Sequence, residues 1–152
     1  MKRCVKEALT VIGKQGSTKD GAGFIQKLWQ EANARFSEIA PLAKKDEAGD
    51  LAGFWGAMSD FSLSFLPWEE NFSKGLYLAG AECVDGAEPP EEWVKWEIPA
   101  YEYVYMENAG PQSFSEGIEY LKASGLSLDG AVHEFNCPKE GKGYLFFPIR
   151  RL

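Results

Sequence analysis

One order of sequence patterns occurs twice in this chain: a β-type run, an amphipathic helix and two further β-type runs. The second occurrence does not repeat the residues of the first, so the duplication is one of pattern only. A chain of 152 residues has the length of one domain, with little room for a second. The sequence therefore predicts a single α+β domain over 1–152, in which an antiparallel sheet carries two helices. The expected elements are a strand, a helix and two strands at 5–14, 23–39, 51–58 and 75–84, and again at 94–106, 113–124, 131–137 and 144–150.

The two helices have the clearest sequence signals. Apolar residues of the first recur at helical spacing, and Pro41 follows where the helix should end. Asp20 is placed to cap its N-terminus. In the second helix, Ser113 and Glu116 form the pattern of a capping box, and Gly125 stands where a C′ glycine would end the helix. The apolar stripe of the first helix consists of Phe24, Ile25, Leu28, Trp29, Ala32, Phe36 and Ile39.

The charge balance excludes some functions. Sixteen Lys and Arg against 23 Asp and Glu give a net charge of −7 at pH 7, and a surface this negative repels phosphate backbones. Direct binding of DNA or RNA is therefore not expected, and a neutral or cationic small ligand suits the charge better. No apolar run approaches the roughly 20 residues that a membrane helix needs, so no membrane partner is expected either.

The cysteines and the histidine bear on metals and compartment. We interpret Cys4, Cys83 and Cys137, an odd number at wide spacing, as reduced thiols of a cytoplasmic protein, since the N-terminus also lacks the apolar stretch of a signal peptide. His133 is the only histidine, which excludes a zinc site of three histidines. The sequence thus predicts neither a metal nor a cofactor, and it places His133 at the surface or on the helix side of the sheet.

Glu134 is the most unusual residue, because it stands in the middle of a predicted strand among apolar and aromatic neighbours, where glutamate is disfavoured. If it points into an aromatic pocket, burial raises its pKa unless a cation neutralises it, and ring faces add cation–π attraction. That arrangement suits an organic cation. The alternative is that Glu134 lies on a solvated face of the sheet. Neighbours on a strand point to opposite faces, so His133 and Glu134 are not expected to share one substrate.

Aromatic residues are the second unusual feature, with 5 Trp, 6 Tyr and 10 Phe. Such residues usually form core, yet several lie near turns and carry polar tips, as in a cage for a flat ligand. The stretch 61–72 is too apolar for an ordinary surface loop. Two interpretations stay open for it: a lid over a pocket, or a plug at one end of the core.

Several motifs together resemble one family. Ile98–Tyr105 (IPAYEYVY), Ala131–Phe135 (AVHEF) and Leu145–Ile149 (LFFPI) are similar, in order and spacing, to three strands of GyrI-like small-molecule-binding domains. Trp55–Asp60 and Phe24–Trp29 resemble the stand-alone bacterial branch of that family, and the resemblance covers nearly the whole chain. It implies two βαββ units related by pseudo-twofold symmetry. In BmrR-like and AraC-type regulators such a domain binds the effector, so the resemblance implies a stand-alone binding protein here.

The resemblance also implies a multidrug-type pocket for lipophilic, often cationic, aromatic compounds. Its central acidic residue would be Glu134, while Tyr103 and Phe146 would contribute rings and Tyr101, where many members have glycine, would narrow the pocket. Together with the aromatic pattern, this gives a predicted ligand site of Glu134, Trp55, Met58, Trp68, Trp96, Tyr101, Tyr103, Tyr105, Tyr144 and Phe146.

Two other functions follow from the same resemblance. One branch of the family resembles hydrolases that open the cyclopropane ring of DNA-alkylating natural products. There Glu134, or a water that it holds, would assist attack on the strained ring, while Trp55, Trp68 and Tyr103 orient the ligand. A more distant alternative is a protein contact that modulates DNA gyrase, for which an acidic surface would mimic DNA. The sequence favours a binding protein and leaves open whether the chain is an enzyme.

Overall fold

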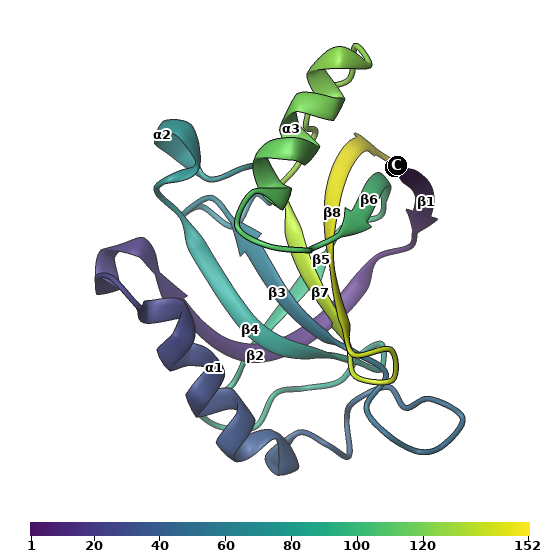
Figure 1. The fold of residues 1–152 in the computed structure, drawn as a ribbon. Coiled ribbons are helices and arrows are strands. Elements are labelled where there is room, and N and C mark those ends of the chain that lie inside the picture. Colours follow the sequence, from purple (N-terminus) through teal and green to yellow (C-terminus); the bar gives the residue numbers. More distant parts are fainter.

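The computed structural model describes all residues, Met1–Leu152, and folds them around one eight-stranded antiparallel sheet that curls strongly (Figure 1). This confirms the predicted α+β class with an antiparallel sheet. The strands are β1 (Lys2–Lys6), β2 (Leu9–Ser17), β3 (Phe54–Ser59), β4 (Leu76–Cys83), β5 (Val94–Ile98), β6 (Tyr101–Glu107), β7 (His133–Cys137) and β8 (Lys142–Arg151). The helices are α1 (Phe24–Arg35), the short α2 (Glu69–Phe72) and α3 (Ser113–Ala123).

The strand order shows how two βαββ units share one sheet. It reads β1-β6-β8-β7-β3-β4-β2-β5, so β2-α1-β3-β4 and β6-α3-β7-β8 meet where β3 pairs with β7. In each unit the last strand lies between the other two. The strand before each unit is added to the edge of the other: β1 pairs with β6, and β5 pairs with β2. The pseudo-twofold relation itself stays a prediction.

Two predicted strands each prove to be two strands. The run 5–14 divides at Glu7 and Ala8 into β1 and β2, which lie far apart in the sheet. The run 94–106 divides at Pro99 and Ala100 into β5 and β6. Proline has no N–H to donate to a strand ladder, which explains the second break. The prediction of a single strand for each run is wrong. The strand-like sequence pattern continues through the residues at which the chain leaves one position in the sheet and enters another.

The start of α1 differs from the prediction. Its N-cap is Gly23, in the left-handed conformation at φ 79°, and no side chain caps the helix. Asp20 instead accepts a hydrogen bond from the Ser17 amide at 2.8 Å, in a capping box around the single 3-10 turn that precedes α1. A second 3-10 turn, Phe36–Glu38, follows α1 before Pro41, so the predicted end is close to the observed one.

The sequence predicted one end of α3 correctly and the other wrongly. The predicted capping box is wrong, because Ser113 is the first helical residue and its hydroxyl accepts from the Ala109 amide at 2.9 Å in the preceding loop. The predicted glycine end is confirmed. Gly125 has a φ of 72°, and the amide of Leu126 donates to the carbonyl of Leu121 at 2.8 Å, as in a Schellman motif.

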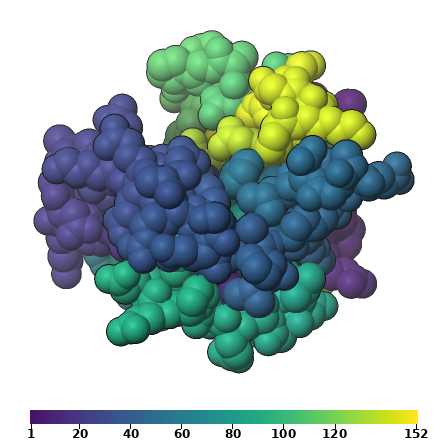
Figure 2. Space-filling model, turned by 90° about the horizontal axis from the view of Figure 1, so that it is seen from below, coloured from purple at the N-terminus to yellow at the C-terminus, as the bar shows by residue number.

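The sheet has two faces with different partners. One, which we call the helix face, carries α1 and α3 (Figure 1). There α1 buries Ala32 against Tyr77 of β4, and α3 buries Leu121 against Phe147 of β8. Seen from below, α1 and the segment after it cover the middle of the surface (Figure 2). The other face, which we call the aromatic face, packs into the largest core cluster: Leu9, Val11, Trp55, Ala57, Leu76, Leu78, Trp96, Ile98, Tyr101, Tyr103 and Phe146.

Candidate functional site

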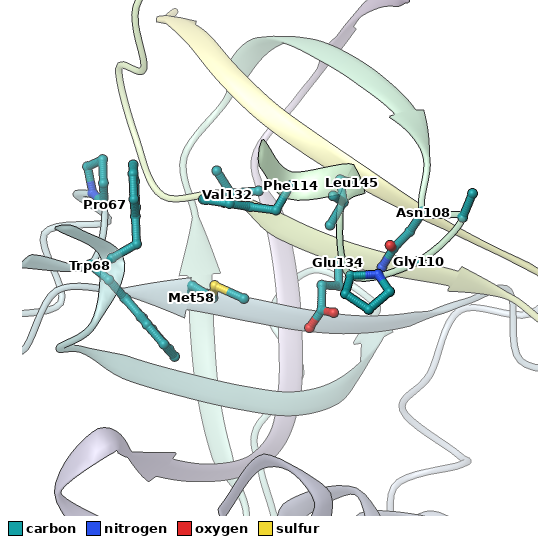
Figure 3. Close-up of a pocket in the computed structure, with 12 residues that line it drawn as sticks. Met58, Pro67, Trp68, Asn108, Gly110, Phe114, Val132, Glu134 and Leu145 are labelled. Carbon is teal, nitrogen blue, oxygen red and sulfur yellow. The ribbon is translucent and has the colours of Figure 1, made fainter. Parts of the chain in front are cut away.

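A pocket of about 630 Å³ opens on the helix face, between the sheet, α3 and the segment around α2 (Figure 3). This volume lies within the range of small-molecule sites. Most of the lining is apolar, and the only charged residue in it is Glu134. The lining residues are Met58, Pro67, Trp68, Phe72, Asn108, Ala109, Gly110, Pro111, Phe114, Val132, Glu134 and Leu145.

Glu134 reaches the pocket because of its place in the central strands. It lies on β7 opposite Gly56 of β3 and Leu145 of β8, and its carboxylate points into the pocket from the helix face (Figure 3). Of the two interpretations of this residue, the structure thus favours the pocket over a solvated face. Burial raises the pKa of the Glu134 carboxyl above its ordinary value, although a hydrogen bond from Tyr77 opposes the rise.

Two aromatic residues behind the carboxylate hold it in place. The hydroxyl of Tyr77 on β4 donates to Glu134 Oε1 at 2.7 Å and accepts from Trp29 Nε1 on α1 at 2.9 Å. Gly56 leaves the space for this contact, since a Cβ there would lie 2.0 Å from the Tyr77 hydroxyl and 2.9 Å from Glu134 Oε1. Desolvation, together with the nearby Glu134 charge, raises the pKa of Tyr77, so its hydroxyl stays protonated and remains a donor.

The walls of the pocket are apolar surfaces fixed by neighbours. Trp68 donates from Nε1 to the Leu76 carbonyl at 2.8 Å and stacks on Phe24, with ring centroids 6.5 Å apart. Phe72 meets Phe114 of α3 edge to face, with centroids 5.0 Å apart. The segment around α2 and the start of α3 therefore close one side of the pocket with rings.

The stretch 61–72, for which the sequence left a lid and a plug as open interpretations, has features of each. Phe61 and Phe65 pack against the aromatic face, as a plug would, while Trp68 and Phe72 line the pocket on the other side, as a lid would. Asp60 anchors the start of the segment, because its Oδ1 accepts from the Ser64 amide at 2.9 Å.

The sheet divides the predicted ligand residues into two groups. Glu134, Met58 and Trp68 line the pocket. The others, on β3, β5, β6 and β8, lie in or against the cluster on the aromatic face, because successive residues of a strand point to opposite sides of the sheet and these residues fall on the far side. The residues that do not line the pocket are Trp55, Trp96, Tyr101, Tyr103, Tyr105, Tyr144 and Phe146.

Several residues of the site are absent from the sequence prediction. Tyr77 and Trp29 lie within predicted elements, yet nothing in the sequence shows that β4 and α1 bring them to Glu134. Phe72 falls in the apolar stretch that the sequence marked as a possible lid. The loop Asn108–Pro111 carries the only side-chain amide of the lining, and its turn residues gave no functional signal.

His133 lies apart from its neighbour Glu134, as the strand geometry predicted, but its environment differs from the prediction. It is fully buried, and its Nδ1 accepts from the Met58 amide at 3.1 Å. Burial lowers the pKa of His133 to about 3, so the ring is neutral at physiological pH. The surface or helix-side placement is therefore wrong: the imidazole packs edge to face with Trp55, with centroids 6.5 Å apart.

The side chains offer no metal site, since His, Cys, Asp and Glu residues do not gather in groups of three or more that could hold an ion. None of the helices has the length and apolar character needed to cross a membrane.

No protein-family model matches the chain, and no curated protein sequence does either. Solved structures do match. SAV2435 bound to tetraphenylphosphonium gives a TM-score of 0.66 at 18% identity, over 98% of this chain and 93% of that one. The C-terminal domain of EcmrR gives 0.64 at 13% identity, over 99% and 98%. A hydrolase from Listeria innocua gives 0.54 at 15% identity, over 97% and 90%.

These matches define the class of fold. SAV2435 is a GyrI-like protein, and EcmrR is a BmrR-like regulator. The likeness spans nearly all of this chain in each case, while the sequences share fewer than one residue in five. The chain therefore has the fold of GyrI-like small-molecule-binding domains, as its strand motifs predicted.

Proposed function

We propose that this protein binds lipophilic aromatic cations in the pocket on the helix face. The observation that carries the proposal is a single carboxylate, Glu134, in the lining of an otherwise uncharged and largely apolar pocket. A cation of low hydration loses little on leaving water, gains attraction to the carboxylate and rests against ring faces. The tetraphenylphosphonium bound to SAV2435, a protein of the same fold, has this chemistry and supports the proposal.

The charge of the pocket also sets what it rejects. An anion of the same shape would meet Glu134 with no Lys or Arg in the lining to offset the repulsion. A neutral compound would gain the apolar contacts alone. We therefore expect the order cation, neutral compound, anion at neutral pH, and we expect the difference to depend on Glu134.

The test is a calorimetric titration with tetraphenylphosphonium and with its anionic counterpart tetraphenylborate, which has almost the same shape. The wild type should bind the cation and discriminate against the anion. Glu134→Gln should lose cation affinity by roughly tenfold or more and lose most of the discrimination, since opposite charges about 6 Å apart attract by roughly 2–3 kcal/mol at an effective dielectric constant of about 20. Glu97→Gln, on the edge strand β5, removes the same charge far from the pocket and should change neither. Equal affinity of wild type and Glu134→Gln for the cation would refute the proposal.

A second candidate function is hydrolysis of a strained ring, as in the cyclopropane-opening branch. The observation that favours it is the raised pKa of Glu134 beside a protonated Tyr77 hydroxyl, since a carboxylate of raised pKa is a better base towards a water molecule. The match to a hydrolase from Listeria innocua points the same way. In this reaction a water oxygen attacks a ring carbon, the ring C–C bond breaks, and the proton removed from water returns to the opened ligand. Mass spectrometry should then show the ligand gaining one water with wild type and not with Glu134→Gln.

The contact with DNA gyrase and the cytoplasmic location stay predictions from the sequence. Co-purification with gyrase in the absence of any small molecule tests the first, and fractionation of cells that express the protein tests the second.

A further inference from the structure

The carboxylate of the pocket is held by residues that do not line the pocket. Tyr77 is 1% exposed, and its hydroxyl provides the one hydrogen bond that reaches Glu134. Trp29, on the inner side of α1, donates to the same hydroxyl. The chain Trp29–Tyr77–Glu134 thus runs from a helix, through a strand, to the ligand site.

The donor and the acceptor of each of these two hydrogen bonds follow from the chemistry of the three side chains when Glu134 is ionised. An indole N–H can only donate, so Tyr77 accepts from Trp29, and an ionised carboxylate can only accept, so Tyr77 directs its own proton to the ionised Glu134. The two contacts measure 2.9 Å and 2.7 Å, which are good hydrogen-bond distances. The hydroxyl then both accepts and donates, and the ionised carboxylate receives a donor on Oε1. The second oxygen, Oε2, is left for the ligand.

Packing keeps the ring of Tyr77 from moving away. Trp29 and Phe24 of α1 both meet it edge to face, with centroids 6.5 Å and 6.4 Å from that of Tyr77. On the opposite side, the backbone of Gly56 faces the Tyr77 hydroxyl where any larger residue would collide with it. The tyrosine is thus clamped between a helix and a glycine, with its hydroxyl aimed at one carboxylate oxygen.

We propose that Tyr77 and Trp29 are positioning residues that keep Glu134 in one orientation and favour its ionised form against the effect of burial, so that the site accepts cations that exchange no proton with it. This inference rests on the proposed function and extends it to residues outside the lining. A neutral amine can take up the proton of a neutral carboxylic acid and so form an ion pair with it, whereas a phosphonium or quaternary ammonium ion has no basic site and needs a carboxylate that is already charged. The donor on Oε1 meets that need.

The hydrogen bond opposes the effect of burial on Glu134, so its loss has a defined sign. Tyr77→Phe removes the donor and keeps the ring, which leaves burial unopposed and moves the pKa of Glu134 further above its ordinary value. Trp29→Phe leaves the donor in place but removes the contact that directs it. We therefore expect Trp29→Phe to raise the pKa of Glu134 as well, but by less than Tyr77→Phe does.

The first experiment follows the Glu134 carboxyl by carbon-13 NMR in the protein without ligand. The titration midpoint of Tyr77→Phe should lie above that of the wild type, with Trp29→Phe between them. Tyr120→Phe on α3 and Trp93→Phe before β5 make the same chemical changes elsewhere and should titrate like the wild type. Circular dichroism and thermal melting show whether each variant is folded, and Trp29→Phe tests the inference if Tyr77→Phe is not. Equal midpoints in all folded variants overturn it.

The second experiment measures tetraphenylphosphonium affinity against pH. At neutral pH, Tyr77→Phe should bind about tenfold more weakly than the wild type, because a hydrogen bond to a charged group is lost. The deficit should shrink as the pH rises and Glu134 ionises again. A deficit that is the same at every pH would mean that Tyr77 acts through packing alone and would overturn the positioning role. If the wild type does not bind the cation, the proposed function fails, and the NMR titration still decides the inference.

Discussion

The two faces of the sheet carry similar aromatic residues in different roles. The aromatic face carries Trp55, Trp96 and Tyr103, all buried in a filled core. The helix face also carries rings, such as Trp68 and Phe72, but these surround a space. The difference comes from small residues and one charge, because Gly56 and Glu134 occupy the helix face where β3 and β7 place bulky rings on the other side. Aromatic content therefore does not distinguish a cage from a core.

The largest effect that tests this contrast is on stability. Trp55→Ala should lower the free energy of unfolding by about 3–5 kcal/mol, because Trp55 is 1% exposed and its removal leaves a large cavity. Trp68→Ala should cost less, since Trp68 is only partly buried, but should weaken cation binding strongly. Urea unfolding and calorimetry of both variants measure the two effects. The assignment of Trp55 to the core and not to the pocket would be wrong if a folded Trp55→Ala variant bound the cation more weakly than the wild type.

A pH-dependent effect distinguishes the aromatic face. The pKa of His133 is lowered to about 3 by burial, so its contribution to stability is complete above its ordinary value of 6.5 and is lost as the pH falls towards 3. His133→Asn keeps an acceptor for the Met58 amide but does not titrate. The wild type should therefore lose stability relative to this variant as the pH falls from 6.5. Parallel curves from urea unfolding at several pH values would show that the ring is not buried in the neutral form.

The neighbouring Glu134, on the other face, should behave with the opposite sign. Its pKa is raised, because burial outweighs the Tyr77 hydrogen bond, so its favourable contribution is present below its ordinary value of 4.5 and is lost as the pH rises through the raised value. The stability of Glu134→Gln relative to wild type should thus increase with pH over that range. Unfolding of the two proteins in the absence of ligand measures this, and a constant difference would argue that the carboxylate is solvated.

The smallest expected effect concerns α2, in the segment that joins the faces. Glu70, Asn71 and Phe72 all have left-handed backbone conformations, with φ of 50°, 59° and 64°. Such a conformation costs a residue with a side chain about 1 kcal/mol, so Glu70→Gly should raise the free energy of unfolding by roughly that amount or less. Glu70→Gln controls for the exposed ion pair with Lys74. If Glu70→Gly lowered the free energy of unfolding by more than Glu70→Gln does, residue 70 would not be held in the left-handed conformation.

The sequence predicted the class of fold well because its signals are local. The helical stripe up to Ile39, the C′ glycine Gly125 and the alternation of β-type residues each act over a few positions. The signal for Glu134 was of the same kind, since a charge inside an apolar strand is visible without partners.

The other residues of the candidate site could not be predicted, because they depend on the register of the strands and on which face of the sheet carries the pocket. Trp55 and Gly56 are neighbours, and a change of register by one residue would exchange their faces. Tyr77 meets Glu134 only because β4 and β7 flank β3 in the order of the sheet. Contacts that join residues 57 positions apart are set by topology, and the sequence pattern carries no trace of them.

The exchange of β1 and β5 between the two units has a consequence for how the chain assembles. Cys4 lies opposite Tyr103, so the first strand cannot take its place until the chain beyond residue 100 has been made. Contacts of such long range slow folding, and they also join the halves into one cooperative unit. A cut in the loop between Cys83 and Val94 would give two fragments, each holding a strand that belongs at the edge of the other. Neither fragment alone contains all the strands of its half of the sheet. Mixing the two fragments should restore the complete order of eight strands.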